Sequence, residues 1–334
     1  MRVLVAAPLL AVLAIGCHDR DDKRAEELEE LAATIDSRLA PIALVEVPNA
    51  PRWSLGDRRV VVGDAIAVDR AALALQIYRA DPEAYAESAR PIPTDGAVVT
   101  LEDRQVPAAA IRGGTVRALT DALHEPPPGQ MGESPNDVGG SVDLFIDGRT
   151  PYATFATILQ TVVWDRRRPC LVVRSGGRLA ALPLRFPAAS GSCTGASCIP
   201  VLQEPRTAPE PADTDAERAD EPAPDASLDL TLTIDDRGVD VFGSGGALEP
   251  GCQRLRAGSD DGPTIPRTAG ALNGAAIEAC LQAIADVFVG DDEVWIQPEP
   301  STPFAEVALV ASIAVGPRAE RFPELRFARP DTER

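Results

Sequence analysis

The sequence predicts an α+β fold built from two small domains in tandem, each a mixed β-sheet with two helices packed on one face. Two observations lead to this prediction. A short motif occurs once in each half of the chain, and the elements predicted around each copy follow the same order of hairpin, helix, strand, capped helix and strand. Helices and strands in that order bury their apolar sides by forming two packed layers.

The motif itself is the clearest part of the repeat. Residues 150–156 read Thr-Pro-Tyr-Ala-Thr-Phe-Ala, residues 302–308 read Thr-Pro-Phe-Ala-Glu-Val-Ala, and four of these seven positions are identical. Threonine is a good N-cap, and proline suits the first position of a helix, where its missing N–H costs nothing. The helices that follow carry apolar residues at core-facing spacings, namely Phe155, Ile158, Leu159 and Val162 in one copy and Val307, Val310, Ala311 and Ala314 in the other.

The elements before the motif are repeated more weakly. In the second half, residues 228–242 predict a hairpin whose turn is Asp235-Asp236-Arg237-Gly238. In the first half, residues 60–68 read as a hairpin broken at Gly63-Asp64, although residues 41–97 could join the first sheet or form an added flap. Helical spacings follow in both halves, at Val116, Leu119 and Leu123 and at Ile277, Leu281, Ile284 and Phe288.

The composition of the remaining segments predicts where the domains begin and end. Residues 203–227 hold eight acidic residues, five prolines and no large apolar side chain, so they cannot bury enough surface to fold alone. We therefore expect a signal peptide at 1–16, a charged helical stalk at 17–40, a first domain at 41–187, a disordered linker at 188–227 and a second domain at 228–330. The stalk carries a narrow apolar stripe, which is more typical of a solvated helix than of a coiled coil.

The beginning of the chain predicts the compartment. Arg2 is followed by thirteen uncharged residues and then by Gly16-Cys17. This apolar run is shorter than the roughly 20 residues that a membrane-spanning helix needs, and it is typical of a secretory signal. The segment before the cysteine resembles a bacterial lipobox, which implies that Cys17 becomes an acylated N-terminus and anchors the protein to a membrane. The alternatives are an uncleaved anchor and a soluble secreted protein.

An exported chain can form disulfides. Cys193 and Cys198 enclose a four-residue loop and could pair locally, while Cys252 and Cys280 lie in one later segment and could fasten it. Cys170 lies in an apolar run and is expected to be a buried free thiol. No Cys-x-x-Cys motif is present in the sequence, and we predict no metal site.

Charge and residue types exclude several functions. The chain has 32 basic and 51 acidic side chains, so we expect no nucleic-acid partner, because such binding depends on cations that meet phosphates. Its two histidines have no partner at ligand spacing. Asp147 near Tyr152 and His124 near Glu125 are the candidate catalytic pairs. Asp147 is better explained as a turn or cap residue, and His124 as a surface residue at a helix end. We predict neither an enzyme nor a cofactor.

This arrangement resembles that of one family. A strand, a short loop with Asp147, then Pro151 and Tyr152 at a helix start, and a final strand together resemble the periplasmic domain of the ExbD/TolR proteins. In the second copy Pro303 and Phe304 fit the pattern, but Gln297 and Glu299 stand where the aspartate is expected. The second copy also has an insertion at about 243–270. The resemblance covers residues 98–186 and 228–328.

The resemblance implies a role beside a membrane motor. ExbD/TolR proteins work with ExbB/TolQ subunits in proton-driven biopolymer transport, and their periplasmic domains associate in pairs, so the two copies here could pack against each other. This chain has no acidic residue before Asp19, and a carboxylate relays protons across a bilayer only from within it, so we do not expect it to conduct protons.

The resemblance thus implies an envelope lipoprotein that acts in protein–protein interaction, as an accessory of such a motor, through residues that include Asp147, Pro151, Tyr152, Pro303 and Phe304. The alternative is a cell-wall-binding or ligand-binding periplasmic module without a motor. His18 stands where an aspartate would retain a lipoprotein at the inner membrane, which favours the outer membrane.

Overall fold

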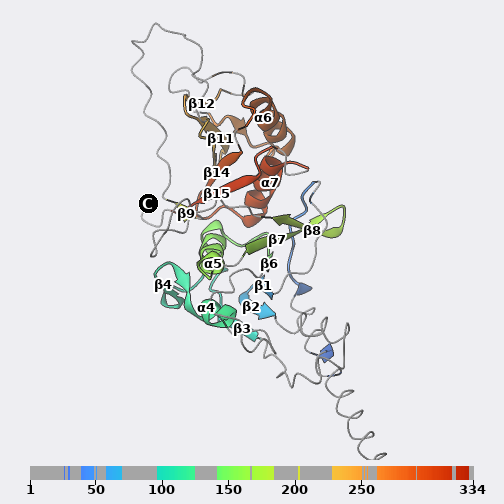
Figure 1. Ribbon diagram of the computed structural model, residues 1–334, viewed down its shortest axis with the longest axis vertical. Helices are drawn as coiled ribbons and strands as arrows, with labels where there is room; N and C mark the ends of the chain where they lie inside the picture. The colour runs from blue at the N-terminus through green and yellow to red at the C-terminus, as the bar shows by residue number, and fades with distance from the viewer. Residues whose placement is uncertain are drawn as a thin grey trace, which may run out of the picture.

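The computed structural model describes two sheets and the helices that cover them (Figure 1). The described residues are 26, 29–30, 39–48, 50, 58–69, 96–124, 141–165, 168–183, 202–203, 228–249, 252, 254, 262–290, 292–317 and 321–330. Several predicted features lie outside these residues, namely the signal peptide with Cys17, most of the stalk and linker, Cys193 and Cys198. None of the helices in the described part is long and apolar enough to cross a membrane.

The first unit is a six-stranded mixed sheet with the strand order β3-β2-β1-β6-β7-β8. Its strands are β1 (Arg58–Val62), β2 (Ala65–Asp69), β3 (Gly96–Thr100), β6 (Ser141–Ile146), β7 (Arg168–Ser175) and β8 (Arg178–Pro183). Strand β6 runs parallel to both β1 and β7, and the remaining pairs are antiparallel. Its helices are α4 (Arg117–His124) and α5 (Tyr152–Trp164), preceded by the short elements η1 (Ala108–Ala110), β4 (Ile111–Arg112) and β5 (Thr115–Val116).

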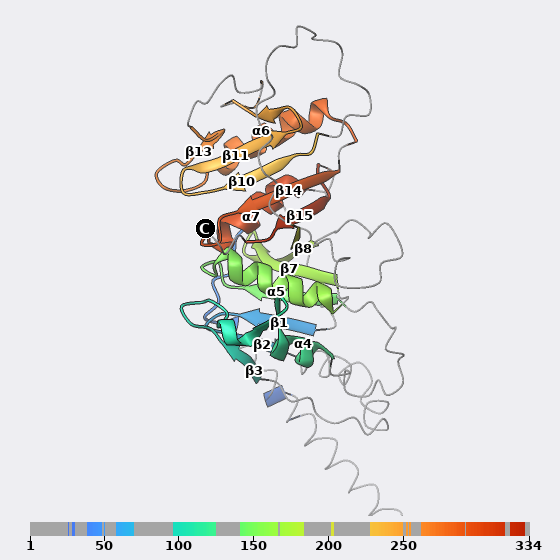
Figure 2. The same ribbon diagram turned by 90° about the vertical axis from the view of Figure 1, so that its left-hand side faces the viewer.

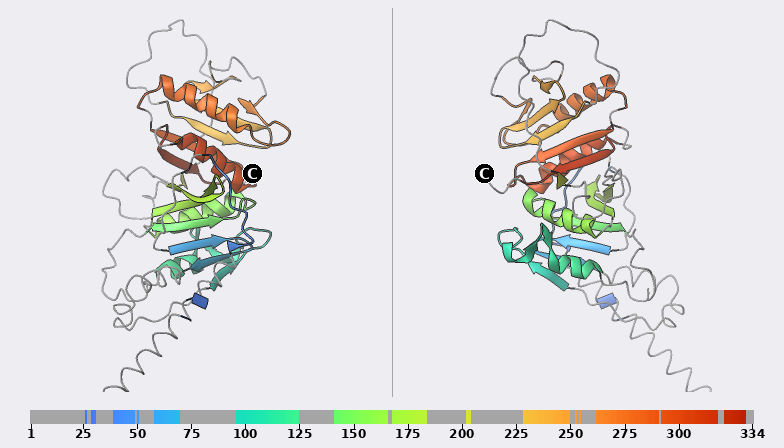
Figure 3. Two further views of the ribbon diagram at one scale, coloured as in Figure 1. Left: turned by 90° about the vertical axis from the view of Figure 1, so that its right-hand side faces the viewer. Right: turned by 60° about the vertical axis from the view of Figure 1, so that its left-hand side comes forward.

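The second unit has the strand order β12-β11-β10-β14-β15-β9 and repeats the inner part of this plan. Its edge strand β9 differs, because it is parallel to β15 whereas β8 is antiparallel to β7. Its strands are β9 (Leu202–Gln203), β10 (Thr231–Ile234), β11 (Gly238–Gly243), β12 (Gly246–Ala247), β13 (Ile265–Pro266), β14 (Glu293–Pro298) and β15 (Glu324–Ala328). Strand β13 pairs with β11 outside this order. Its helices are α6 (Gly274–Val287) and α7 (Phe304–Val315) (Figure 3).

The predicted α+β class is confirmed, and the inner strands of the two units share their order and register. Leu144 of β6 lies between Val60 and Leu171, and Ile296 of β14 lies between Leu232 and Phe327 in the same way. The hairpin at 58–69 belongs to the first sheet, as one of the two alternatives for residues 41–97 proposed, and residues 70–95 lie outside the described residues. The repeat in the structure therefore begins earlier than residue 98, at β1.

Alternation along the strands separates two faces of the first sheet. Val60, Leu144 and Leu171 belong to the large core that also contains the helices. Their neighbours Val61, Phe145 and Val172 point to the other face and pack with Ile42. The side chains of a strand alternate between faces, so one sheet can serve both packing layers. Leu39, Ile42 and Leu44 thus cover part of the face that the helices leave open.

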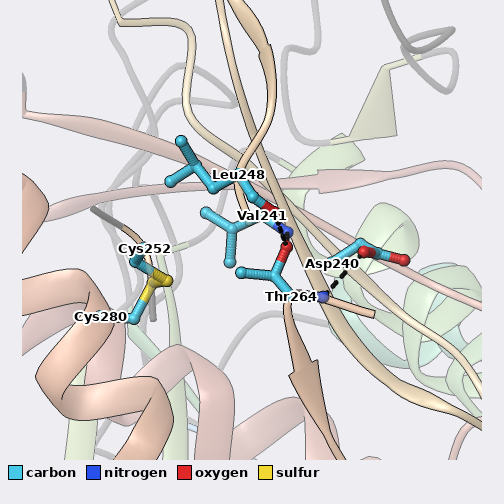
Figure 4. Close-up of a disulfide and its surroundings, with 6 residues drawn as sticks. All are labelled: Asp240, Val241, Leu248, Cys252, Thr264 and Cys280. Atoms are coloured by element: carbon cyan, nitrogen blue, oxygen red, sulfur yellow. Dashed lines mark hydrogen bonds between the residues drawn. A yellow bond between two sulfur atoms is a disulfide. The ribbon is translucent and has the colours of Figure 1, made fainter. Parts of the chain in front are cut away.

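The insertion in the second unit is fastened to α6 by a disulfide between Cys252 and Cys280 (Figure 4). The insertion is also tied to β11. Thr264 donates its amide to a carboxylate oxygen of Asp240 and its hydroxyl to the carbonyl of Leu248, and it accepts the amide of Val241. Thr264 is buried, so these bonds satisfy polar atoms that would otherwise be costly there.

Removal of this disulfide should lower stability. The bond closes a loop with a sequence separation of 28 residues, and a loop of this size restricts the unfolded chain enough to contribute about 2–4 kcal/mol. We expect the double change Cys252→Ala and Cys280→Ala to lower the free energy of urea unfolding by that amount. Cys170→Ala is the control, because Cys170 is a free thiol. Equal unfolding midpoints for the double variant and the control would contradict the prediction.

Candidate functional site

The two units meet at the loops that follow β6 and β14. Figure 2 shows the two sheets one above the other, with the strands of the second unit above those of the first. Pro151 and Pro303, which directly precede α5 and α7, face each other in an isolated antiparallel bridge. The repeated motif therefore lies at the contact between the units, and we call residues 147–151 and 299–303, which precede the two helices, the paired loops.

The paired loops cap each other's helices. The amides of Tyr152 and Ala153 at the start of α5 donate to the carbonyls of Thr302 (2.8 Å) and Pro300 (3.0 Å). The first amides of a helix have no partner within the helix, so an external acceptor satisfies them. Here the acceptors are main-chain carbonyls of the other unit.

The opposite helix is capped in the same way. The amides of Phe304 and Ala305 at the start of α7 donate to the carbonyls of Thr150 (2.7 Å) and Gly148 (2.9 Å). Each bond has its counterpart at the equivalent position of the other motif. The contact therefore has approximate two-fold symmetry, as an isologous dimer interface has.

The start of α5 differs from the prediction. The Thr-Pro motif predicts Thr150 as the N-cap and Pro151 as the first helical residue, but the helix begins at Tyr152 and Pro151 is its N-cap, with no side-chain cap. The same shift occurs at α7, where Pro303 is the N-cap. The threonine side chains are not needed as caps because carbonyls of the other unit accept the free amides.

Aromatic rings from both units pack against one another beside these hydrogen bonds. The ring of Phe155 lies 4.9 Å from that of Phe304 and 5.5 Å from that of Phe327, measured between centroids. Tyr152 is fully buried and donates its hydroxyl to the carbonyl of Ala328 at the end of β15. Burial raises the pKa of Tyr152 far above its usual range. A single hydrophobic cluster consequently runs through both units.

Asp147 organises the first of the paired loops. Its carboxylate accepts the amide of Arg149 (2.9 Å), two hydrogen bonds from the guanidinium of Arg149 (2.9 and 2.8 Å) and the amide of Ala43 (3.3 Å). Arg104 adds an ion pair at 3.2 Å. Burial alone would raise the pKa of Asp147, but the bonds from Arg149 and Ala43 and the charge of Arg104 outweigh it and lower the pKa to about 2. The carboxylate is therefore ionised and fully engaged at neutral pH.

The second loop keeps the backbone bonds of the first but not its carboxylate. The amide of Glu299 donates to Ile234, and that of Thr302 donates to Glu299, as Asp147 and Thr150 do with their equivalents. The side chain of Glu299 is exposed. An ion pair at a neighbouring position supports this loop instead, because Arg267 holds both carboxylate oxygens of Glu306 (2.6 and 2.7 Å).

The structure brings together all the residues that the motif indicated. Asp147, Tyr152 and Phe304 are buried, Pro151 is half-buried and Pro303 is exposed. Pro151, Tyr152, Pro303 and Phe304 contact the other unit, whereas the partners of Asp147 lie in its own unit. Arg104, Phe155 and Phe327 complete the site but were not identified from the sequence as site residues. Arg104 carries no local signal, since a tight turn far along the chain from Asp147 places it there. Cys17, Cys193 and Cys198 cannot be placed, because they lie outside the described residues.

The candidate catalytic side chains of the first paired loop and of the helix start beside it are engaged in contacts. Asp147 is held by arginines, and Tyr152 is buried with its hydroxyl engaged. No group of three His, Cys, Asp or Glu side chains within the described ranges could hold a metal ion. The main-chain donors and acceptors and the aromatic rings of this site take part in the contact between the units.

Loss of the central ring should weaken the contact. We expect Phe155→Ala to lower the free energy of unfolding of the full chain by about 3–5 kcal/mol, because it leaves a cavity among three buried rings. Trp164→Ala on the same helix is the control, since Trp164 is 40% exposed and should change stability far less. Similar losses for the two variants in urea unfolding would contradict a central role for Phe155.

The buried carboxylate predicts a pH dependence. The pKa of Asp147 in the folded protein, about 2, lies below the ordinary value of 3.8, so its contribution to stability is present above pH 4 and is lost as the pH falls towards 2. We expect Asp147→Asn to remove about 1–2 kcal/mol at pH 7 and little at pH 2. Glu299→Gln, at the exposed equivalent position, is the control. A stability difference between wild type and Asp147→Asn that does not change with pH would contradict the assignment.

Comparisons of the chain with protein-family models, with curated proteins and with solved structures found no match. The functional interpretation therefore depends on the repeated motif, the order of elements and the geometry of the paired loops.

Proposed function

We propose that this chain is an envelope lipoprotein in which two ExbD/TolR-like domains form an internal pair and act in protein–protein interaction beside a proton-driven ExbB/TolQ-type motor. The acylated Cys17 would tether it to a membrane, with the pair facing the periplasm. Proton transfer would belong to the membrane-spanning subunits of the motor and not to this chain.

The single observation that supports this proposal best is the reciprocal capping of α5 and α7 by the paired loops. The motif that resembles the family is also the surface through which the two copies associate. Family members are expected to associate in pairs, and a duplicated chain can achieve the same pairing within one molecule. A linker raises the effective concentration of the second copy, so the pair can form without a second chain.

Two steps test the proposal in cells that make the protein. Mass spectrometry of the mature N-terminus should find fatty acid on Cys17, and Cys17→Ser should release the protein from the membrane fraction. Affinity purification of the wild-type full chain from gently cross-linked membranes should then recover ExbB/TolQ-type subunits, identified by their own peptides. The Cys17→Ser variant is the control, because it keeps both units but lacks the acylation site.

The outcomes separate the steps of the proposal. A mature chain without fatty acid would contradict the lipoprotein assignment. An acylated chain that recovers no ExbB/TolQ-type subunit would contradict the motor role. Retention of that chain on isolated cell wall would then favour the wall-binding alternative, and Arg149→Ser would test it because the side chain of Arg149 is 63% exposed.

A further inference from the structure

Three consecutive apolar residues stand exposed at the end of α6. Val287, Phe288 and Val289, which we call the apolar tip, are 72%, 38% and 89% exposed. Val287 is the last residue of α6, and the amide of Phe288 still donates to the carbonyl of Ile284 at 2.9 Å. Gly290 then turns the chain with a φ of 109°, and a Cβ built there would meet nothing within 4 Å. The tip therefore projects from ordered helical structure into open space.

The fold itself does not require this tip. The residues of α6 that pack into the core are Ile277, Cys280, Leu281 and Ile284, and all of them precede it. The equivalent helix of the first unit, α4, ends at His124 and continues in the sequence as Glu-Pro-Pro-Pro. One copy of the repeat thus carries an apolar run where the other carries polar residues and proline. Exposed apolar surface that folding does not explain commonly marks an interaction site.

The charges beside the tip indicate what it contacts. Asp286 precedes the tip and Asp292 follows it, and both are exposed. Asp291 adds a third acidic residue in the sequence, and the whole chain carries a net charge of −19. Acidic flanks are repelled by the anionic surface of a membrane and attracted by cationic groups on a protein.

We propose that the apolar tip docks into an apolar pocket with a cationic rim on a partner protein. The valines and Phe288 would enter the pocket, while Asp286 and Asp292 would meet the rim. This inference does not depend on the motor role, because it uses only the exposure and the charges of this segment.

The test uses the full mature chain with Cys17→Ser, so that no acyl group contributes, and defined peptide probes. The probe is an amphipathic helical peptide with leucines on one face and lysines beside them. One control peptide carries glutamates in place of the lysines, and another carries serines in place of the leucines. Fluorescence anisotropy should show binding of the first peptide only, weakened by added salt, because salt screens the exposed charges.

Substitutions then locate the binding site. We expect Val287→Ser combined with Val289→Ser to weaken binding of the leucine–lysine peptide by at least about tenfold. Leu179→Ser is the matched control, since Leu179 is an apolar residue of the first unit that is 40% exposed, and it should leave binding unchanged. Asp286→Lys combined with Asp292→Lys should transfer the preference to the leucine–glutamate peptide. Circular dichroism would verify that each variant is folded.

Several results would overturn the proposal. Equal peptide binding by the valine double variant and the Leu179→Ser control would show that the tip is not the site. Failure of all the peptide probes to bind the wild-type tip would also overturn the proposal. Sedimentation with vesicles of phosphatidylcholine and phosphatidylglycerol that is lost on changing the two valines would show a membrane contact instead.

Discussion

The contact between the two units depends on reciprocal hydrogen bonds at the starts of α5 and α7. The free amides at the start of α5 are satisfied by carbonyls of the loop before α7, and those of α7 by the loop before α5. Helix starts that are buried without acceptors would be costly, because each amide would lose its hydrogen bonds to water. Neither loop can therefore be buried in this way without the other, and this mutual requirement joins the units into one body with a shared core.

The two copies differ where symmetry does not require identity. The backbone bonds of the paired loops are repeated, but Asp147 with its arginines supports one loop while Arg267 and Glu306 support the other. The hydroxyl of Tyr152 donates to the carbonyl of Ala328 in β15, whereas Phe304, at the equivalent position of the second copy, has no hydroxyl. A homodimer must place the same side chains on both sides of its axis, whereas a duplicated chain can change each side separately. The apolar tip in one copy alone is a further difference of this kind.

Local sequence patterns predicted the main elements but not their contact. Alternating and helical spacings, the Asp-Asp-Arg-Gly turn and the Thr-Pro motif predicted the hairpins at 60–68 and 228–242 and the two helices of each unit, because these signals are local. The contribution of residues 58–69 to the centre of the first sheet is a long-range pairing with β6, which no local pattern specifies. Arg104 reaches Asp147 across the fold, and the helix caps come from main-chain carbonyls, which carry no side-chain signal. For this reason the prediction that Thr150 is the N-cap of α5 was wrong.

Hydrogen exchange of four amides tests the pairing most directly. In the full chain under native conditions, the amides of Tyr152, Ala153, Phe304 and Ala305 should exchange slowly and at similar rates, since opening one side of the contact opens the other. The first amides of helices that lack external acceptors exchange quickly, so rapid exchange at these four positions would show that the units do not cap each other and would contradict the account.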